Sequence, residues 1–225
     1  MTVVVLLVAL IGGGGGWTVA AKPDLLGMAA VSAQSSPAAT PTHSSTAPPP
    51  TVINCRDQVR AGDKAVKAAR QSYQDWYQHV HAELDLDAGK ITFDQAQAIW
   101  ERTHKLGSKD MSRFDSTKIL YENRGKACSK VVPEQVLAPF TDDAHDCKTR
   151  QAAIADTIAA GSKVAADWSK HTLQHRTKQT ADPSAYHEAW MKAVHAAPAH
   201  LKAFRTQYAA YKKAPSCFAQ PKQGE

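Results

Sequence analysis

The chain contains an internal duplication, in which a cysteine, a tryptophan and a histidine recur at one fixed spacing. The first copy and the second, which lies 92 residues later, are Cys55, Trp76, His79 and Cys147, Trp168, His171. A repeat constrains the fold because each copy must specify a similar piece of structure. Two similar units are therefore expected, packed against each other in one domain.

The match continues through the second half of each unit. Trp100, Phe114, Tyr121 and Cys128 correspond, at spacings of 90 or 89 residues, to Trp190, Phe204, Tyr211 and Cys217. Each unit thus runs from one cysteine to another, 55–128 and 147–217, with a linker at 129–141. Because roughly the first 50 of the 225 residues differ in composition from the rest, we expect one duplicated domain over 52–225, which is long enough to bury a sizeable core.

Both units carry apolar or small residues every seven positions, which is typical of helices that pack along a seam. In the first unit, two helices beginning near residue 52 and at residue 93 have the seams Val59, Val66, Tyr73, Val80 and Phe93, Trp100, Gly107, Phe114, Tyr121, Cys128. In the second unit the seams are Cys147, Ile154, Ile158, Gly161, Ala165, Trp168 and Trp190, Val194, Ala197, Leu201, Phe204, Tyr208, Tyr211.

Helix boundaries are marked by capping residues. Thr92 and Gln95 form a capping-box pattern, Asp182 followed by Pro183 opens the last helix, and Asp142 or Asp143 can cap the third. Gly107 and Pro198 predict bends at about the same height in the two long second helices. The sequence therefore predicts an all-α fold, an antiparallel four-helix bundle made of two duplicated helical hairpins.

The four cysteines predict two disulfides. An even number of cysteines in an exported protein is typical of disulfide bonding. In a hairpin the two ends lie together, so Cys55 with Cys128 and Cys147 with Cys217 would each close one hairpin and add about 4 kcal/mol in the chain-entropy model. The alternative pairing, Cys128 with Cys147 and Cys55 with Cys217, also joins residues at that end and stays open.

The first 51 residues divide into two segments that do not resemble the repeats. The twenty residues from Thr2 to Ala21 carry no charge, so segment 1–33 is expected to be an export signal, with a cleavage pattern at Val31-Ser32-Ala33, or else a membrane anchor. Segment 34–51 has five Pro, four Ser and four Thr, which predicts an extended, disordered spacer. An extracytoplasmic location follows, with the protein secreted or anchored to the cell membrane.

A candidate metal site lies in the repeated part. Residues spaced by four form one ridge in each unit, Asp75, His79, Glu83 and Asp167, His171, His175. Each carboxylate precedes a histidine by one turn and can orient its imidazole. If the two ridges face each other, three imidazoles and three carboxylates would suit a divalent transition metal.

The structural interpretation of these ridges is simpler: Asp-His pairs can edge a core beside buried tryptophans, with no cofactor required. Glu101 and His104 also have metal-ligand spacing, but Met191 and Val194 stand at the matching positions of the second unit. The sequence lacks a nucleophile motif and a phosphate-binding glycine loop. We therefore expect a protein without catalytic activity.

Basic residues concentrate near the C-terminus. From Lys170 onward there are nine Lys or Arg against three Asp or Glu, and this excess equals the net charge of +6 of the whole chain. The candidate binding residues are Lys202, Arg205, Lys212 and Lys213. In an exported protein such a face predicts an anionic envelope polymer or lipid headgroups as partners, and excludes nucleic acid.

Two functions remain as expectations. The first is an exported or membrane-tethered helical binding or structural protein of the cell envelope, whose N-terminal segment contacts the membrane at least transiently. The second is a metal- or haem-binding envelope protein that uses the paired Asp/His ridges.

Overall fold

The computed structural model describes residues 47–177 and 182–217, with side chains described as far as Gln174 and again from Asp182. The expected export or anchor segment, 1–33, lies outside the described residues, as does most of the spacer. None of the helices in the described ranges is both long enough and apolar enough to span a bilayer.

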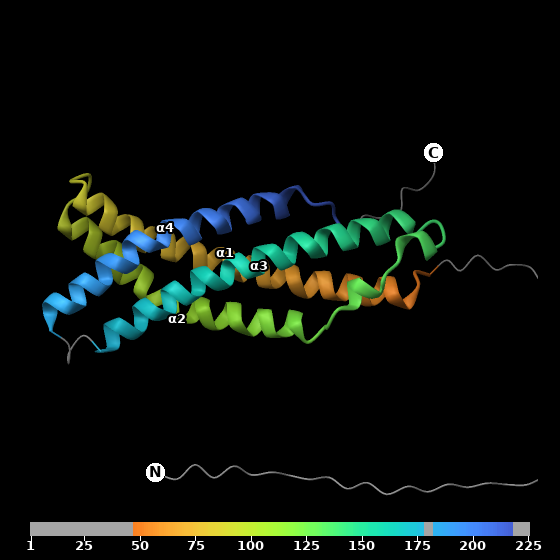
Figure 1. Cartoon of the computed structure of the whole chain (residues 1–225), viewed down its shortest axis with the longest axis horizontal. Helices are drawn as coiled ribbons and strands as arrows, with labels where there is room; N and C mark the ends of the chain where they lie inside the picture. Colours follow the sequence, from red (N-terminus) through yellow and green to blue (C-terminus); the bar gives the residue numbers. More distant parts are fainter. Residues whose placement is uncertain (1–46, 178–181, 218–225) are drawn as a thin grey trace, which may run out of the picture. The chain divides into compact units, whose positions relative to one another are not determined.

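Helices account for all the regular structure of the described residues. In chain order they are α1 Pro50–Asp87, α2 Phe93–Glu122, the short 3-10 helices η1 Ala127–Lys130 and η2 Pro133–Gln135, α3 Thr141–Thr177 and α4 Pro183–Lys213 (Figure 1). The described part contains no strand. The prediction of an all-α protein with four long helices is confirmed.

Two of the three expected helix starts are confirmed. The Thr92 hydroxyl accepts a hydrogen bond from the backbone N–H of Gln95, whose side chain accepts one from the N–H of Thr92. The Asp182 carboxylate accepts a hydrogen bond from the N–H of Ser184. In contrast, α3 already begins at Thr141, so Asp142 and Asp143 lie in its first turn. Negative charge there interacts favourably with the helix dipole.

Two boundaries differ from the expected ones. Helix α1 begins at Pro50, inside the predicted spacer 34–51, because a proline in the first turn lacks only an N–H that would have no helical partner. Helix α2 ends at Glu122, since Gly125 adopts a left-handed conformation with φ of 64°. Cys128 therefore lies in η1 rather than in the α2 seam.

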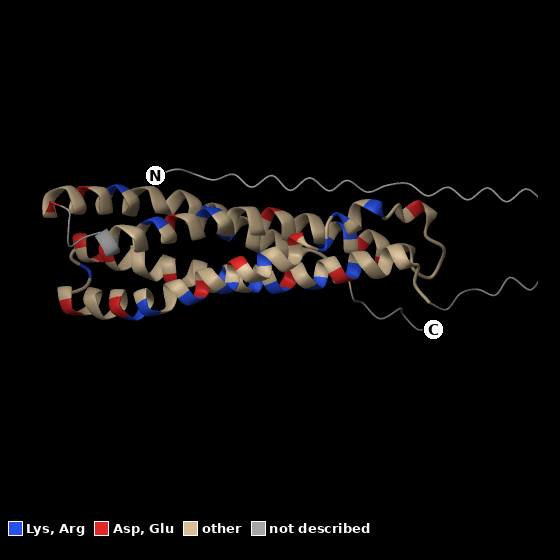
Figure 2. Ribbon diagram, turned by 90° about the horizontal axis from the view of Figure 1, so that it is seen from below, with Lys and Arg blue, Asp and Glu red and all other residues tan. Residues whose placement is uncertain are grey.

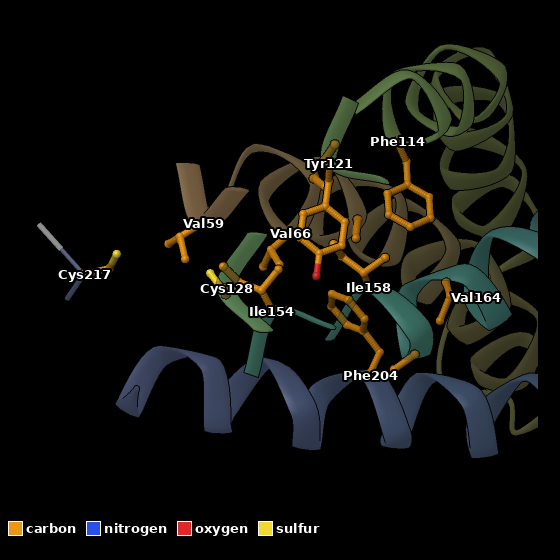
Figure 3. Close-up of a cluster of buried hydrophobic side chains, with 14 of the residues drawn as sticks. Val59, Val66, Phe114, Tyr121, Cys128, Ile154, Ile158, Val164, Phe204 and Cys217 are labelled. Carbon is orange, nitrogen blue, oxygen red and sulfur yellow. The ribbon is translucent and has the colours of Figure 1, made fainter. Parts of the chain in front are cut away.

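The long helices pack in neighbouring pairs. Helix α1 lies along both α2 and α3, and α3 lies along α4 (Figure 1). Side chains from all four helices converge in the core, where Val66, Tyr121, Ile158 and Phe204 point toward one another (Figure 3). The linker 129–141 contributes to this core, because Val131 and Val136 are buried.

The first residue of the predicted α2 seam is an exception. Phe93 is 60% exposed and contacts Trp100 edge to face, with ring centroids 6.2 Å apart. It is the first residue of α2 and follows directly on the loop that connects α1 to α2. The seven-residue spacing identifies the face of a helix, but it does not show how far along the helix the partner extends.

The structure contains the disulfides Cys55–Cys128 and Cys147–Cys217, which is the pairing within each unit. Polar groups join the two units to each other. Asp63 of α1 accepts hydrogen bonds from Arg150 of α3, at 2.9 Å, and from the Tyr211 hydroxyl of α4, at 2.8 Å. Two disulfides fit an oxidising environment outside the cytoplasm.

Candidate functional site

The matched histidines meet inside the protein. His79 of α1 and His171 of α3 are 2% and 1% exposed, and their ring centroids lie 4.7 Å apart. Each histidine belongs to the longer first helix of its unit, and these two helices pack along each other. Of the two ridges, the histidines therefore do face each other, which was one condition of the metal hypothesis.

Three tryptophans surround the two imidazoles, and we call these five residues the His–Trp cluster. Trp76 and Trp168 are matched residues of the two units, and their ring centroids lie 4.7 Å apart. Trp190 of α4 lies 4.3 Å from the His171 ring. Aromatic rings at such distances contribute to stability beyond the area that they bury, so the cluster holds α1, α3 and α4 together.

Two residues of the cluster, His79 and Trp190, have polar partners just outside it. The Thr103 hydroxyl of α2 donates to the carbonyl of Ile99, so the same oxygen can accept from Nδ1–H of His79, 2.8 Å away. Glu83 accepts a hydrogen bond from the indole N–H of Trp190 at 3.1 Å. Burial raises the pKa of Glu83, and the bond from Trp190 acts in the opposite direction.

A glycine brings α2 into contact with the cluster. A methyl group at Gly107 would lie 2.4 Å from the indole of Trp168, closer than real side-chain contacts. The α2 backbone therefore approaches α3 through the position that lacks a side chain. The sequence predicted a bend at Gly107, and α2 changes direction partway along its length (Figure 1).

The two matched aspartates make contacts that the sequence did not predict. Asp75 of α1 accepts a hydrogen bond from Gln71 and faces Asp110 of α2; both aspartates are buried. Burial, and then the hydrogen bond and charge of Asp75, raise the pKa of Asp110 to about 6. In the second unit Asp167 faces His200 of α4, with the carboxylate oxygen 2.7 Å from Nδ1. Asp110 and His200 are themselves matched, at the 90-residue spacing.

The described residues do not assemble the predicted metal ligands. No group of three or more His, Cys, Asp or Glu in the described part is arranged to hold a metal ion. The carboxylates of Asp75, Glu83 and Asp167 contact Asp110, Trp190 and His200 respectively. The side chain of His175 lies outside the described residues. Glu101 and His104 are both exposed on α2.

The predicted basic residues of α4 are all exposed. Lys202, Arg205, Lys212 and Lys213 lie in the second half of the helix. Figure 2 shows Lys and Arg in blue and Asp and Glu in red along the helices. Lys202 and Arg205 border a groove of about 260 Å³ between α1 and α4. Lys212 and Lys213 lie in the last turn of α4, where positive charge interacts favourably with the helix dipole.

Comparison of the chain with protein-family models, with curated proteins and with solved structures found no match.

Proposed function

We propose that this chain is an exported, non-enzymatic helical protein that binds an anionic surface of the cell envelope through α4. The observation that carries the proposal is the row of four exposed basic side chains, Lys202, Arg205, Lys212 and Lys213, on a domain closed by two disulfides. The disulfides favour an oxidising compartment. Exposed cationic side chains attract anionic polymers and headgroups without a deep pocket.

The scaffold for this function is proposed to be an antiparallel four-helix bundle of two duplicated hairpins. Three observations support the duplication. Each unit is closed by one disulfide, the matched residues Trp76 and Trp168 contact each other, and so do His79 and His171. The N-terminal segment would serve as an export signal or anchor, and the spacer would give the domain its distance from the membrane.

The His–Trp cluster is proposed to stabilise the domain rather than to bind a metal or haem. Its imidazoles are packed against tryptophan rings, and the neighbouring carboxylates already contact other side chains. A metal site would need at least a third ligand directed at the same point. The described residues contain no such group of three.

Reversing the charges of α4 tests the binding proposal. The variant K202E/R205E/K212E/K213E should no longer sediment with isolated cell envelopes, because attraction becomes repulsion. A matched control reverses four exposed lysines of α2 and α3, Lys105, Lys109, Lys163 and Lys170. The control has the same net charge, so it should keep most of the binding. Equal loss in both variants would show that net charge alone matters and would contradict a site on α4.

A further inference from the structure

The groove between α1 and α4 combines an aromatic wall with two cations. It has a volume of about 260 Å³ and is lined by Tyr73, Tyr77, His81, Pro198, Leu201, Lys202 and Arg205. No acidic residue belongs to this lining. The groove lies at the small end of ligand pockets, which are about 300–1,000 Å³. It can therefore hold one ring-sized group rather than a long segment of a partner.

The α1 wall is a continuous aromatic surface. Tyr73 and Tyr77 are one turn apart, with ring centroids 5.8 Å apart, and the His81 ring lies 3.9 Å from that of Tyr77. Tyr73 is held from behind by Phe204, on which it stacks at 4.8 Å. Tyr77 is 36% exposed. The rings are thus fixed by the core on one side and available to a ligand on the other.

His81 belongs to the aromatic wall and not to the cations. Burial lowers the pKa of its imidazole, an effect that Asp85 opposes and Lys90 reinforces. At neutral pH the ring is therefore mainly uncharged and offers a face to a ligand.

The α4 wall supplies positive charge that no described acidic side chain neutralises. Lys202 and Arg205 are both exposed, and no ion pair involves either of them within the described residues. Burial raises the pKa of the Tyr73 phenol, and the positive charge of Arg205 lowers it. Arginine and lysine bind carboxylates, sulfates and phosphates through charge-assisted hydrogen bonds.

We propose that this groove binds one acidic sugar unit of an anionic polysaccharide. The apolar face of a sugar ring would lie on Tyr77 and His81, while its carboxylate or sulfate would bind Lys202 and Arg205. A lipid phosphate would use the cations but leave the aromatic wall without a partner, so the combined lining favours the sugar. This inference deepens the proposed function and rests on it, because it names the ligand of the same basic face.

Titration calorimetry of the full chain with an oligomer of galacturonic acid tests the inference. The neutral galactose oligomer of equal length serves as the control ligand. Tyr77→Ala and the double variant K202A/R205A should each weaken uronate binding by about five- to tenfold. Tyr77→Phe should keep the affinity, because the ring face is retained. Phe93→Ala, another exposed aromatic residue, and K163A/K170A, which removes two exposed lysines of α3, should leave binding in the groove nearly unchanged.

The inference would be overturned if Tyr77→Ala bound the uronate oligomer like the unmodified chain. It would also be overturned if vesicles containing phosphatidylglycerol were bound and the oligomer were not. In both cases the envelope sedimentation assay could still show binding through α4, which would preserve the proposed function. Failure of sugar binding in the groove is thereby distinguished from failure of envelope binding through α4. Circular dichroism melting of each variant shows that any loss of binding is not a loss of folding.

Discussion

His79 illustrates how the surroundings of a matched residue differ between the two units. Its imidazole meets Thr103 of α2, whereas the position that matches Thr103 in α4 is Ala193. The duplicated sequence therefore keeps the histidine in both units but keeps the hydroxyl in one. Because Thr103 also donates to a helix carbonyl, its oxygen is an acceptor for His79. This bond lies in the interior, where an unsatisfied donor is costly.

Replacing Thr103 by valine should lower the free energy of unfolding by about 1–3 kcal/mol, because Nδ1–H of His79 loses its acceptor while the side-chain volume is kept. Urea denaturation followed by tryptophan fluorescence measures the change. Thr117→Val is the matched control, since the Thr117 hydroxyl also bonds to carbonyls of α2 but accepts from no imidazole. Equal effects in both variants would mean that the His79 contact contributes nothing.

The Asp75–Asp110 pair predicts a pH-dependent stability. The folded protein raises the pKa of Asp110 from 3.8 to about 6, so the folded state binds a proton more tightly than the unfolded state. The protonated pair thus contributes to the free energy of unfolding below pH 4, and this contribution is lost as the pH rises to about 6. Its upper limit is about 3 kcal/mol.

Asp110→Asn should remove this pH dependence, because its amide donates to Asp75 at every pH. The variant should be more stable than the unmodified chain at pH 7.5 and similar to it at pH 4. Thermal melting at the two pH values measures the difference. The exposed Asp115→Asn is the control and should show the same pH dependence as the unmodified chain. A variant that lost stability at pH 7.5 would contradict the account of Asp110.

At the scale of helices, the contact between α2 and α3 depends on a position without a side chain. Gly107 lets the Trp168 indole lie against the α2 backbone. An alanine there would gain helix propensity but would force the indole or the helix to move.

Gly107→Ala should therefore lower the free energy of unfolding by about 1–3 kcal/mol and change the near-ultraviolet circular dichroism of the tryptophans. The neighbouring exposed Ser108→Ala is the control, for which a small change is expected. A Gly107→Ala protein as stable as the unmodified chain, with the same dichroism, would show that the helices are not in close contact at this point.

The helices were largely predictable from the sequence, whereas their polar contacts were not. The seven-residue spacing and the cap residues identified four helices. The ends of the units were compatible with the observed cysteine pairing but left the alternative pairing open. Periodicity shows which face of a helix is buried, but it does not show which residue of the next helix lies at the same height. The contact of Asp75 with Asp110, and that of Asp167 with His200, were therefore missed. The turn at Gly125, which ends α2 before Cys128, was missed as well.

At the scale of the whole molecule, the matched residues and the candidate binding residues lie in different places. The matched cysteines lie inside and close each unit, and the matched tryptophans and histidines lie inside and join the two units. The basic side chains of α4 and the aromatic groove beside them lie outside. The groove is not duplicated, because Tyr77 corresponds to Ser169 and Arg205 to Asp115. The proposed binding face is therefore one that the duplication does not repeat.

The salt dependence of binding to isolated envelopes tests the central claim most directly. If the exposed cations of α4 make the contact, the fraction of protein that sediments should fall steeply between about 0.05 M and about 0.5 M salt, because screening shortens the range of charge interactions to a few ångströms. The K202E/R205E/K212E/K213E variant should show little binding at either concentration. Binding that is equally strong at both salt concentrations, or that survives the charge reversal, would contradict the account.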